Sequence, residues 1–360
     1  MHLIALDLQP ASNRGGQEKS LFDILTGLRD LGVRITLLHV LDGDLLPKYR
    51  EKGIECVRIS RISIMNKLSP GEVFGFLASV LRVWRLGGDV FYINQIVDAP
   101  IAVAAKMLGG IRRVICHLRL PPLVDCGQVR MSIPKIDRFI VANRLMKRLH
   151  VEKGVPEEKV DIIPNGFWMD RIPKPERGKA ATRLRIAYLG RFHEVKGLDV
   201  LLRALGKVHG RGIGLLLEIG GAPLDEKEED YKHQMQQLAE SVGISDSVKW
   251  IGFVSNPVSH LAGYDLTVFP SQWDEPFGRV MVESIVAGTP VIASHRGSSR
   301  EILDEESGDW IFENEDELAD LITKFAVDRS AYPIAAKVEF VRSTFDLKNI
   351  LPQIQAVLAG

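Results

Sequence analysis

The sequence predicts an α/β protein of two domains, each with a parallel sheet between layers of helices. Three observations indicate this fold class. At 360 residues, the chain is too long for one ordinary core, and two domains of roughly 150–200 residues each fit better. Each half opens with an apolar strand, a glycine-containing turn and an amphipathic helix. Strands then alternate with helices, which is typical of parallel sheets.

The first half begins with a strand at residues 3–8 and a turn that contains Gly15 and Gly16. Apolar residues recur at helical spacing in the segment that follows, before Gly32. They are Leu21, Ile24, Leu25, Leu28 and Leu31. This spacing predicts a helix that packs one face on a sheet, and a buried strand at 33–40 comes next.

The second half repeats this order. A strand at 184–190 leads to Arg191, and Lys196 precedes a helical segment at 198–205 and a strand at 214–221. In parallel sheets, ligands bind at the carboxyl ends of the strands, where these turns lie.

The predicted domain boundary lies in a proline-rich polar stretch at 171–182, which is typical of a linker. It separates a first domain at 1–170 from a second domain at 183–335. An apolar helical segment at 336–360 ends the chain, and the acidic run at 225–230 is interpreted as a charged loop.

The composition of the chain indicates which classes of protein it can belong to. No apolar run approaches the roughly 20 residues of a membrane span, and the N-terminus lacks the basic leader of a signal peptide. The three cysteines form no C-x-x-C pair, so we expect a cytoplasmic protein with no zinc site. The sequence has no dense basic stripe with interleaved aromatic residues, so we do not expect nucleic acid as a binding partner.

Charge is unevenly divided. Residues 1–170 hold 24 Lys and Arg against 18 Asp and Glu, and the remainder holds 22 against 28. The basic first half fits acidic acceptors or peripheral contact with an anionic membrane surface, and scattered solvated charge is the alternative.

The most informative motif runs from Glu275 to Glu283 and contains Pro276, Phe277 and Gly278. A glycine allows close approach of the backbone to a ligand, and the helix predicted after it offers free N–H groups. This arrangement suits an anionic phosphate, which Arg191 and Lys196 could neutralise without a metal. The nearest match to a metal-binding carboxylate pair is Asp42 with Asp44, which we interpret as a plain turn.

These motifs resemble those of retaining glycosyltransferases of family 4, which have the GT-B fold. The resemblance covers essentially the whole chain, from G-G-Q-E-K-S-L and I-I-P-N-G to L-G-R-F-H-E-V-K-G-L, I-G-F-V, F-P-S and the two-glutamate motif. It implies two facing Rossmann-like domains with an interdomain cleft. The first domain would bind the acceptor, and the second would bind a nucleotide-sugar donor. In this fold the terminal helix, here 336–360, often crosses back to the first domain.

The resemblance also assigns roles. Arg191 and Lys196 would bind the donor's diphosphate, and surface cations that cap or pair nearby acids are the alternative. Glu283 would contact the ribose hydroxyls, and Glu275 the donor sugar. His117 would lie beside the anomeric region, although C-H-L-R departs from the usual pattern and a structural histidine is the alternative. The remaining donor-binding positions are Gly15, Gly16, Gly190, Phe253, Val254, Pro276, Phe277 and Gly278. Phe253 as a plain core residue is equally compatible with the sequence.

The predicted function is transfer of a hexose, with retention of configuration, from a nucleoside-diphosphate sugar to a saccharide or lipid-linked saccharide hydroxyl in polysaccharide biosynthesis. UDP-glucose is the favoured donor, and no metal is expected. No second carboxylate is evident that could act as a covalent nucleophile. The sequence therefore favours a front-side route, in which the leaving phosphate takes the acceptor's proton. The alternatives are a nucleotide-sugar epimerase of the same fold and a non-catalytic nucleotide-sugar-binding partner of a polysaccharide assembly complex.

Overall fold

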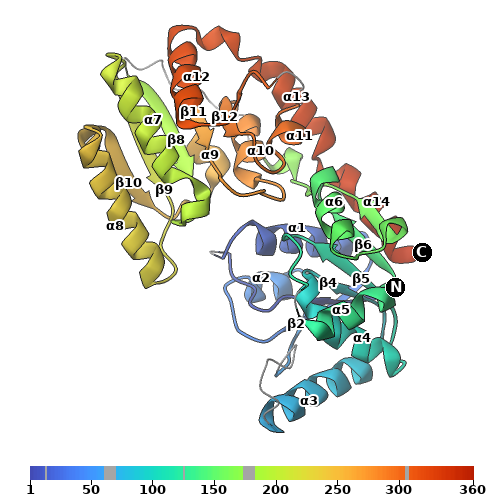
Figure 1. Ribbon diagram of the computed structural model, residues 1–360. Coiled ribbons are helices and arrows are strands. Elements are labelled where there is room, and N and C mark those ends of the chain that lie inside the picture. The colour runs from blue at the N-terminus through green and yellow to red at the C-terminus, as the bar shows by residue number, and fades with distance from the viewer. Residues whose placement is uncertain (13, 61–69, 125, 173–182, 305–307) are drawn as a thin grey trace. The chain divides into compact units, whose positions relative to one another are not determined.

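The computed structural model describes residues 1–12, 14–60, 70–124, 126–172, 183–304 and 308–360 (Figure 1). The predicted linker at 171–182 therefore lies almost entirely outside the described residues. The chain divides into two compact units: unit 1 comprises Met1–Trp168 with Phe345–Gly360, and unit 2 comprises Met169–Thr344.

Unit 1 contains a seven-stranded sheet in the order β3-β2-β1-β4-β5-β6-β7, and every described strand pair is parallel. The strands are β1 His2–Leu6, β2 Arg34–His39, β3 Glu55–Arg58, β4 Gly88–Ile93, β5 Ile111–Leu118, β6 Arg138–Val141 and β7 Val160–Ile162. The helices are α1 Gly16–Asp30, α2 Leu46–Glu51, α3 Pro70–Leu86, α4 Ala99–Met107, α5 Gly127–Ser132, α6 Arg144–Glu152 and α14 Leu347–Ala359.

Both faces of the sheet of unit 1 are buried. Successive residues of a strand point to opposite faces, so neighbours in sequence belong to different layers of the core. Along β1, Leu3 and Ala5 belong to one hydrophobic cluster, and Ile4 and Leu6 belong to another. The first cluster includes residues of α1 and α14, and the second includes residues of α3 and α4.

Unit 2 contains a six-stranded parallel sheet in the order β10-β9-β8-β11-β12-β13. Its strands are β8 Leu184–Leu189, β9 Leu215–Gly220, β10 Val248–Gly252, β11 Leu266–Phe269, β12 Val291–Ser294 and β13 Ile311–Phe312. Its helices are α7 Leu198–Gly210, α8 Glu226–Ser241, α9 Pro257–Leu261, α10 Arg279–Val286, α11 Ser299–Leu303, α12 Glu315–Val327 and α13 Ile334–Thr344. The predicted fold class, two Rossmann-like domains with parallel sheets, is confirmed.

The apolar tail forms two helices, and only α14 belongs to unit 1. The break falls at Phe345 and Asp346, where Asp346 caps α14 by accepting a bond from the backbone N–H of Lys348 at 3.0 Å. Phe167 exchanges backbone bonds with Phe345 and Leu347, at 2.9 and 2.8 Å. The change of unit therefore comes at Phe345, later than residue 336.

The acidic run at 225–230, interpreted above as a loop, is instead the start of α8. Asp225 caps this helix by accepting a bond from the backbone N–H of Glu228 at 2.9 Å. Acidic side chains in a first turn are favourable because they face the positive end of the helix dipole. The expectation of a loop was therefore wrong, since a run of acids is also a helix-start pattern.

Candidate functional site

The candidate site of unit 2 is formed by loops that follow the carboxyl ends of β8 and β11. Lys196 ends a short 3₁₀ helix after β8, and Glu275 lies in the loop between β11 and α10. The Nζ of Lys196 donates to both carboxylate oxygens of Glu275, at 2.8 and 2.7 Å. Two predicted site residues, 79 positions apart in sequence, are thus in direct contact.

Neighbouring side chains complete this contact. The ring of Trp273 lies 5.5 Å from the Nζ of Lys196, within the range of a cation–π interaction. Ser271 donates its hydroxyl to Glu275 at 3.3 Å. Glu275 is therefore held by a cation and by a neutral donor.

Glycines make this geometry possible. Gly197 has a φ of 67°, and a Cβ there would lie 2.0 Å from the carbonyl oxygen of Pro270. Gly297 has a φ of 64°, and a Cβ there would lie 2.4 Å from the backbone N and O of Glu275. Both positions exclude larger residues because backbone atoms fill the space. The loops that carry Lys196 and Glu275 are thus packed backbone against backbone.

Gly278 caps α10 in the left-handed conformation, with a φ of 59°. The preceding Pro276 and Phe277 are buried, so the ring of Phe277 serves packing, and only its main chain remains for a ligand. Glu283 is also buried, one turn into α10, and its carboxylate lies 3.6 Å from the Nε of Arg279. The N-terminus of α10, at Arg279, therefore follows directly on the loop that carries Glu275.

Arg191 makes an ion pair with an acid that sequence analysis did not name. Its Nε donates to Glu228 Oε1 at 2.9 Å, and its Nη2 donates to the same oxygen. Glu228 is only 3% exposed and also accepts the backbone N–H of Leu224 at 3.0 Å. Because a guanidinium has five N–H donors, the pair fixes Arg191 and leaves donors for an anion.

The remaining predicted residues of unit 2 lie at the same sheet edge. Gly190 directly follows β8, and Phe253 and Val254 follow β10. The Phe253 side chain is 54% exposed, so the alternative that it is a plain core residue is wrong. These residues follow strand ends, as ligand-binding residues of parallel sheets do.

In unit 1, Gly15 caps α1 and Gly16 is its first residue, so the helix begins earlier than the apolar periodicity indicates. Both glycines are exposed. Asp44, one of the pair interpreted as a turn, accepts bonds from the backbone N–H and the hydroxyl of Ser12, at 2.7 and 2.6 Å. These bonds lower the pKa of Asp44. Among the described residues, no cluster of three or more His, Cys, Asp or Glu side chains could hold a metal ion.

His117 lies near the end of β5 and is 1% exposed. Its Nδ1 lies 2.5 Å from the hydroxyl of Tyr92 and 3.3 Å from Nη2 of Arg119. A guanidinium can only donate, so Nδ1 is the acceptor and the proton of the neutral ring resides on Nε2. Burial, together with the charge of Arg119, holds the pKa of His117 well below its usual range. Nε2 is buried and has no hydrogen-bond partner among the residues that the structure describes.

Arg119 organises the strand ends around this histidine. Its Nε donates to Asn94 at 2.5 Å, and its Nη1 donates to Asn165. Sequence reasoning missed Arg119, although its position two residues after His117 puts both side chains on one face of the chain. Asn165 belongs to the I-I-P-N-G motif, and sequence analysis gave it no role.

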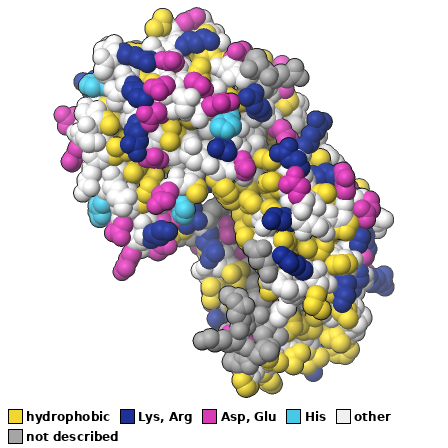
Figure 2. All heavy atoms as spheres, in the orientation of Figure 1, with side chains coloured by type: hydrophobic (Ala, Val, Ile, Leu, Met, Phe, Trp, Pro, Cys, Tyr) yellow, Lys and Arg dark blue, Asp and Glu magenta, His cyan; other side chains and the backbone are white. Residues whose placement is uncertain are grey.

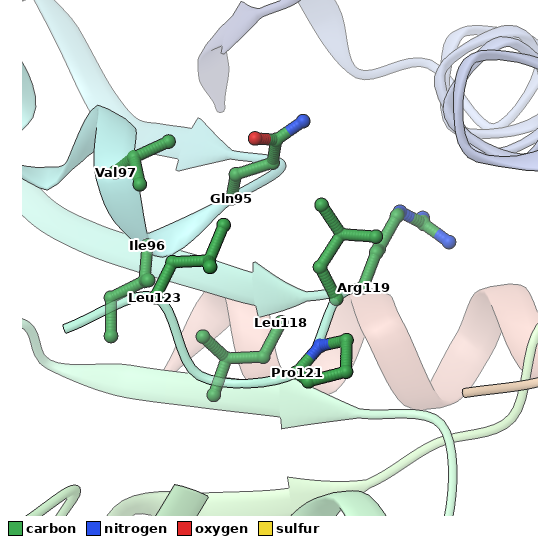
Figure 3. Close-up of a pocket in the computed structure, with 8 residues that line it drawn as sticks. Gln95, Ile96, Val97, Leu118, Arg119, Pro121 and Leu123 are labelled. Carbon is green, nitrogen blue, oxygen red and sulfur yellow. The ribbon is translucent and has the colours of Figure 1, made fainter. Parts of the chain in front are cut away.

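A small pocket opens next to Arg119 in unit 1 (Figure 3). It is lined by Gln95, Ile96, Val97, Leu118, Arg119, Leu120, Pro121 and Leu123. In Figure 3 the amide of Gln95 lies at the top of the view and the guanidinium of Arg119 at the right, with Leu118 and Pro121 below them.

Two buried carboxyls near these strand ends have raised pKa values. Burial and the nearby Glu18 raise the pKa of Asp7 to about 7. Burial and the nearby Asp7 raise the pKa of Asp98 to about 7. Both groups therefore change charge near neutral pH.

The two halves of the chain match two glycosyltransferase family profiles. Residues 14–171 match "Glycosyltransferase Family 4", and residues 171–337 match "Glycosyl transferases group 1". Among solved structures, HepE of Anabaena in complex with UDP and glucose matches with a TM-score of 0.83 at 21% identity, over 100% of this chain and 99% of that one. Sucrose-phosphate synthase of Thermosynechococcus elongatus matches at 0.81 with 18% identity, over 99% and 98%. The chain therefore has the GT-B fold.

Sequence relatives agree with this class. An uncharacterized glycosyltransferase of Methanocaldococcus jannaschii is 31% identical over 46% of this chain and 44% of its own length. A lipopolysaccharide 1,2-N-acetylglucosaminetransferase of Salmonella typhimurium is 26% identical over 61% of each chain. The matched region thus spans less than two thirds of these two relatives. Fold, profiles and relatives together support a GT-B glycosyltransferase.

Proposed function

We propose that the protein is a retaining glycosyltransferase that moves a hexose from a nucleoside-diphosphate sugar to a hydroxyl of a saccharide or a lipid-linked saccharide, in polysaccharide biosynthesis. The observation that carries the proposal is the contact of Lys196 with Glu275 beside the start of α10. It puts a cation for phosphate and a carboxylate for sugar hydroxyls in the loops that precede the N-terminus of α10, whose dipole favours an anion.

Unit 2 would hold the donor. Arg191 and Lys196 would neutralise the diphosphate as it leaves, helped by the N–H groups at Gly278. Glu283 would accept bonds from the ribose hydroxyls, and the main chain at Phe253 and Val254 would contact the base. Charge neutralisation by two fixed cations requires no metal in this proposal, and activity in the presence of EDTA tests that point.

The chemical step is a front-side displacement. The bond between the anomeric carbon and the phosphate oxygen breaks, the acceptor oxygen bonds on the same face, and the acceptor's proton passes to the departing phosphate. The protein contributes mainly position and electrostatic stabilisation. His117 would serve as a hydrogen-bond donor through Nε2, because Nδ1 is occupied by Tyr92 and Arg119.

The donor proposed first is UDP-glucose. Support comes from the fold match to HepE of Anabaena in its complex with UDP-glucose, at a TM-score of 0.82 and 20% identity.

The proposed location is the cytoplasm. The three cysteines are free, which supports this location.

Release of UDP from UDP-glucose, and of GDP from GDP-mannose as comparison, tests the proposal. Slow release without acceptor and faster release with a saccharide acceptor are expected, and NMR of the product should show the donor's anomeric configuration. Conversion of the donor without release of free nucleotide would instead indicate an epimerase. Tight binding with no turnover under any acceptor would indicate a binding protein.

A further inference from the structure

Helix α3 of unit 1 carries an exposed apolar face that the proposed chemistry does not use. Phe74, Leu77, Leu81 and Trp84 are all exposed, from 75% for Phe74 to 42% for Leu81. Their spacing of three and four residues places them along one side of the helix. On other sides of α3, Val80 and Val83 are buried in the core. The helix is thus apolar on its packed side and on its exposed side.

The exposed face continues onto the end of α4. Met107 and Leu108 are 68% and 58% exposed. A Cβ on the nearby Gly110 would lie 2.7 Å from the Cα of Trp84, so this turn packs directly on α3. Figure 2 shows hydrophobic side chains along the lower edge of the view, where α3 lies in Figure 1. We call the six residues Phe74, Leu77, Leu81, Trp84, Met107 and Leu108 the α3 face.

Cations border the α3 face. Arg82 and Arg85 are exposed on α3 itself. Lys135 Nζ lies 3.2 Å from the Sδ of Met107. The one acid on α3, Glu72, is in the first turn and is half-buried. The border of the α3 face therefore attracts anions.

We propose that the α3 face docks on the surface of an anionic lipid bilayer, with α3 lying in the plane of the headgroups. Helices that bind in this way have Phe, Trp and Leu on one side and Arg or Lys beside them. The apolar side chains would enter the acyl boundary, and the two arginines would reach lipid phosphates. This surface is separate from the proposed transfer site and does not depend on the identity of the sugar.

Charge also distinguishes a membrane from a second copy of the chain. A contact between two copies through the α3 face would take Arg82 and Arg85 of each copy out of water, and α3 offers one acid to pair with them, the half-buried Glu72. Burial of charge without a matching partner is unfavourable. An anionic bilayer instead complements both arginines.

Vesicle sedimentation with the full chain tests the proposal. We expect binding to phosphatidylcholine vesicles that contain about 30% phosphatidylglycerol, and weak binding to phosphatidylcholine alone. The double variant Phe74→Ser with Leu77→Ser should reduce binding about tenfold or more, because binding scales with the apolar area inserted. Arg82→Gln with Arg85→Gln should reduce binding to anionic vesicles only.

Matched controls lie elsewhere on the surface. Val327→Ser removes an 83% exposed apolar side chain in unit 2 and should leave binding unchanged. Arg148→Gln removes an exposed cation of unit 1, on α6, and should have little effect. Equal binding by wild type and by the Phe74 and Leu77 variant would overturn the proposal, and so would no binding to anionic vesicles at all.

Two further measurements separate the other outcomes. If gel filtration shows a dimer that the same two serine substitutions dissociate, the α3 face is a contact between copies and the proposal is wrong. Nucleotide release from UDP-glucose in the absence of vesicles should be the same in wild type and variant. Loss of that activity in both proteins would contradict the proposed function and leave the vesicle result to decide the membrane contact.

Discussion

Replacement of Lys196 by Ala removes the cation at the centre of the unit 2 site. Lys196 donates two bonds, at 2.8 and 2.7 Å, to the carboxylate of Glu275. Both side chains are mostly buried, with 20% and 16% exposed. Glu275 would keep the bond from Ser271 and lose its cation.

The expected effects follow from these contacts. Loss of charge-assisted bonds to a mostly buried carboxylate should lower the free energy of unfolding by about 2 kcal/mol. Loss of a cation at the leaving phosphate should lower the turnover number on the order of 10²-fold, as for removal of an oxyanion-hole donor. That factor corresponds to about 2.7 kcal/mol in the activation barrier.

The assay is initial-rate release of UDP from UDP-glucose, with unfolding in denaturant measured on the same samples. Lys207→Ala is the matched control, because Lys207 pairs with Glu315 and Asp316 at 2.6 Å outside the site. The control should keep its turnover. A folded Lys196→Ala variant that releases UDP within about threefold of the wild-type rate would refute the assignment.

Three further predictions concern pH, packing and charge. Burial raises the pKa of Asp98 to about 7. Between about pH 4 and 7 the carboxyl of Asp98 therefore keeps its proton in the folded state and loses it in the unfolded state. The free energy of unfolding should fall as the pH rises through this range. Asp98→Asn should remove the contribution of Asp98 and leave that of Asp7. The variant should be up to about 4 kcal/mol more stable than wild type at pH 8 and little changed at pH 4, measured by denaturant unfolding. Glu228→Gln should lower the free energy of unfolding by about 2 kcal/mol, since it weakens the acceptor of Arg191; an unchanged denaturation midpoint would contradict this. Gly297→Ala forces a Cβ onto the backbone of Glu275. The free energy of unfolding should fall by at least about 1 kcal/mol, and release of UDP should be slower. Release of UDP at the wild-type rate would refute the packing argument.

The sequence predicted the architecture well because buried parallel strands leave a strong pattern. Apolar runs at 3–8, 33–40, 184–190 and 214–221 all overlap strands of the two sheets. Glycine turns after the first strand of each half fell where α1 and α7 begin. Ends of elements were less well predicted, because capping depends on single side chains such as Asp225 and Asp346.

The side-chain partners of the proposed site residues could not be predicted from the sequence. Lys196 and Glu275 could be proposed from motifs, but their contact depends on how two loops pack. Glu228 was missed because it lies in an acidic run, and sequence does not show which acid of the run is buried. Glu228 lies in the first turn of α8, which follows β9 after the loop at 221–225, and it is buried there.

His117 shows how neighbouring strands set a chemical role that the residue type leaves open. Histidine at this position could donate, accept or transfer a proton near neutral pH. Tyr92 on β4 and Arg119 after β5 both contact Nδ1, so one tautomer is fixed and the lowered pKa keeps the ring neutral. A ring in this state has no free basic nitrogen, which argues against general-base catalysis by His117. In the proposed reaction the acceptor's proton must therefore leave by another route, and the departing phosphate is the group that gains basicity as the bond breaks.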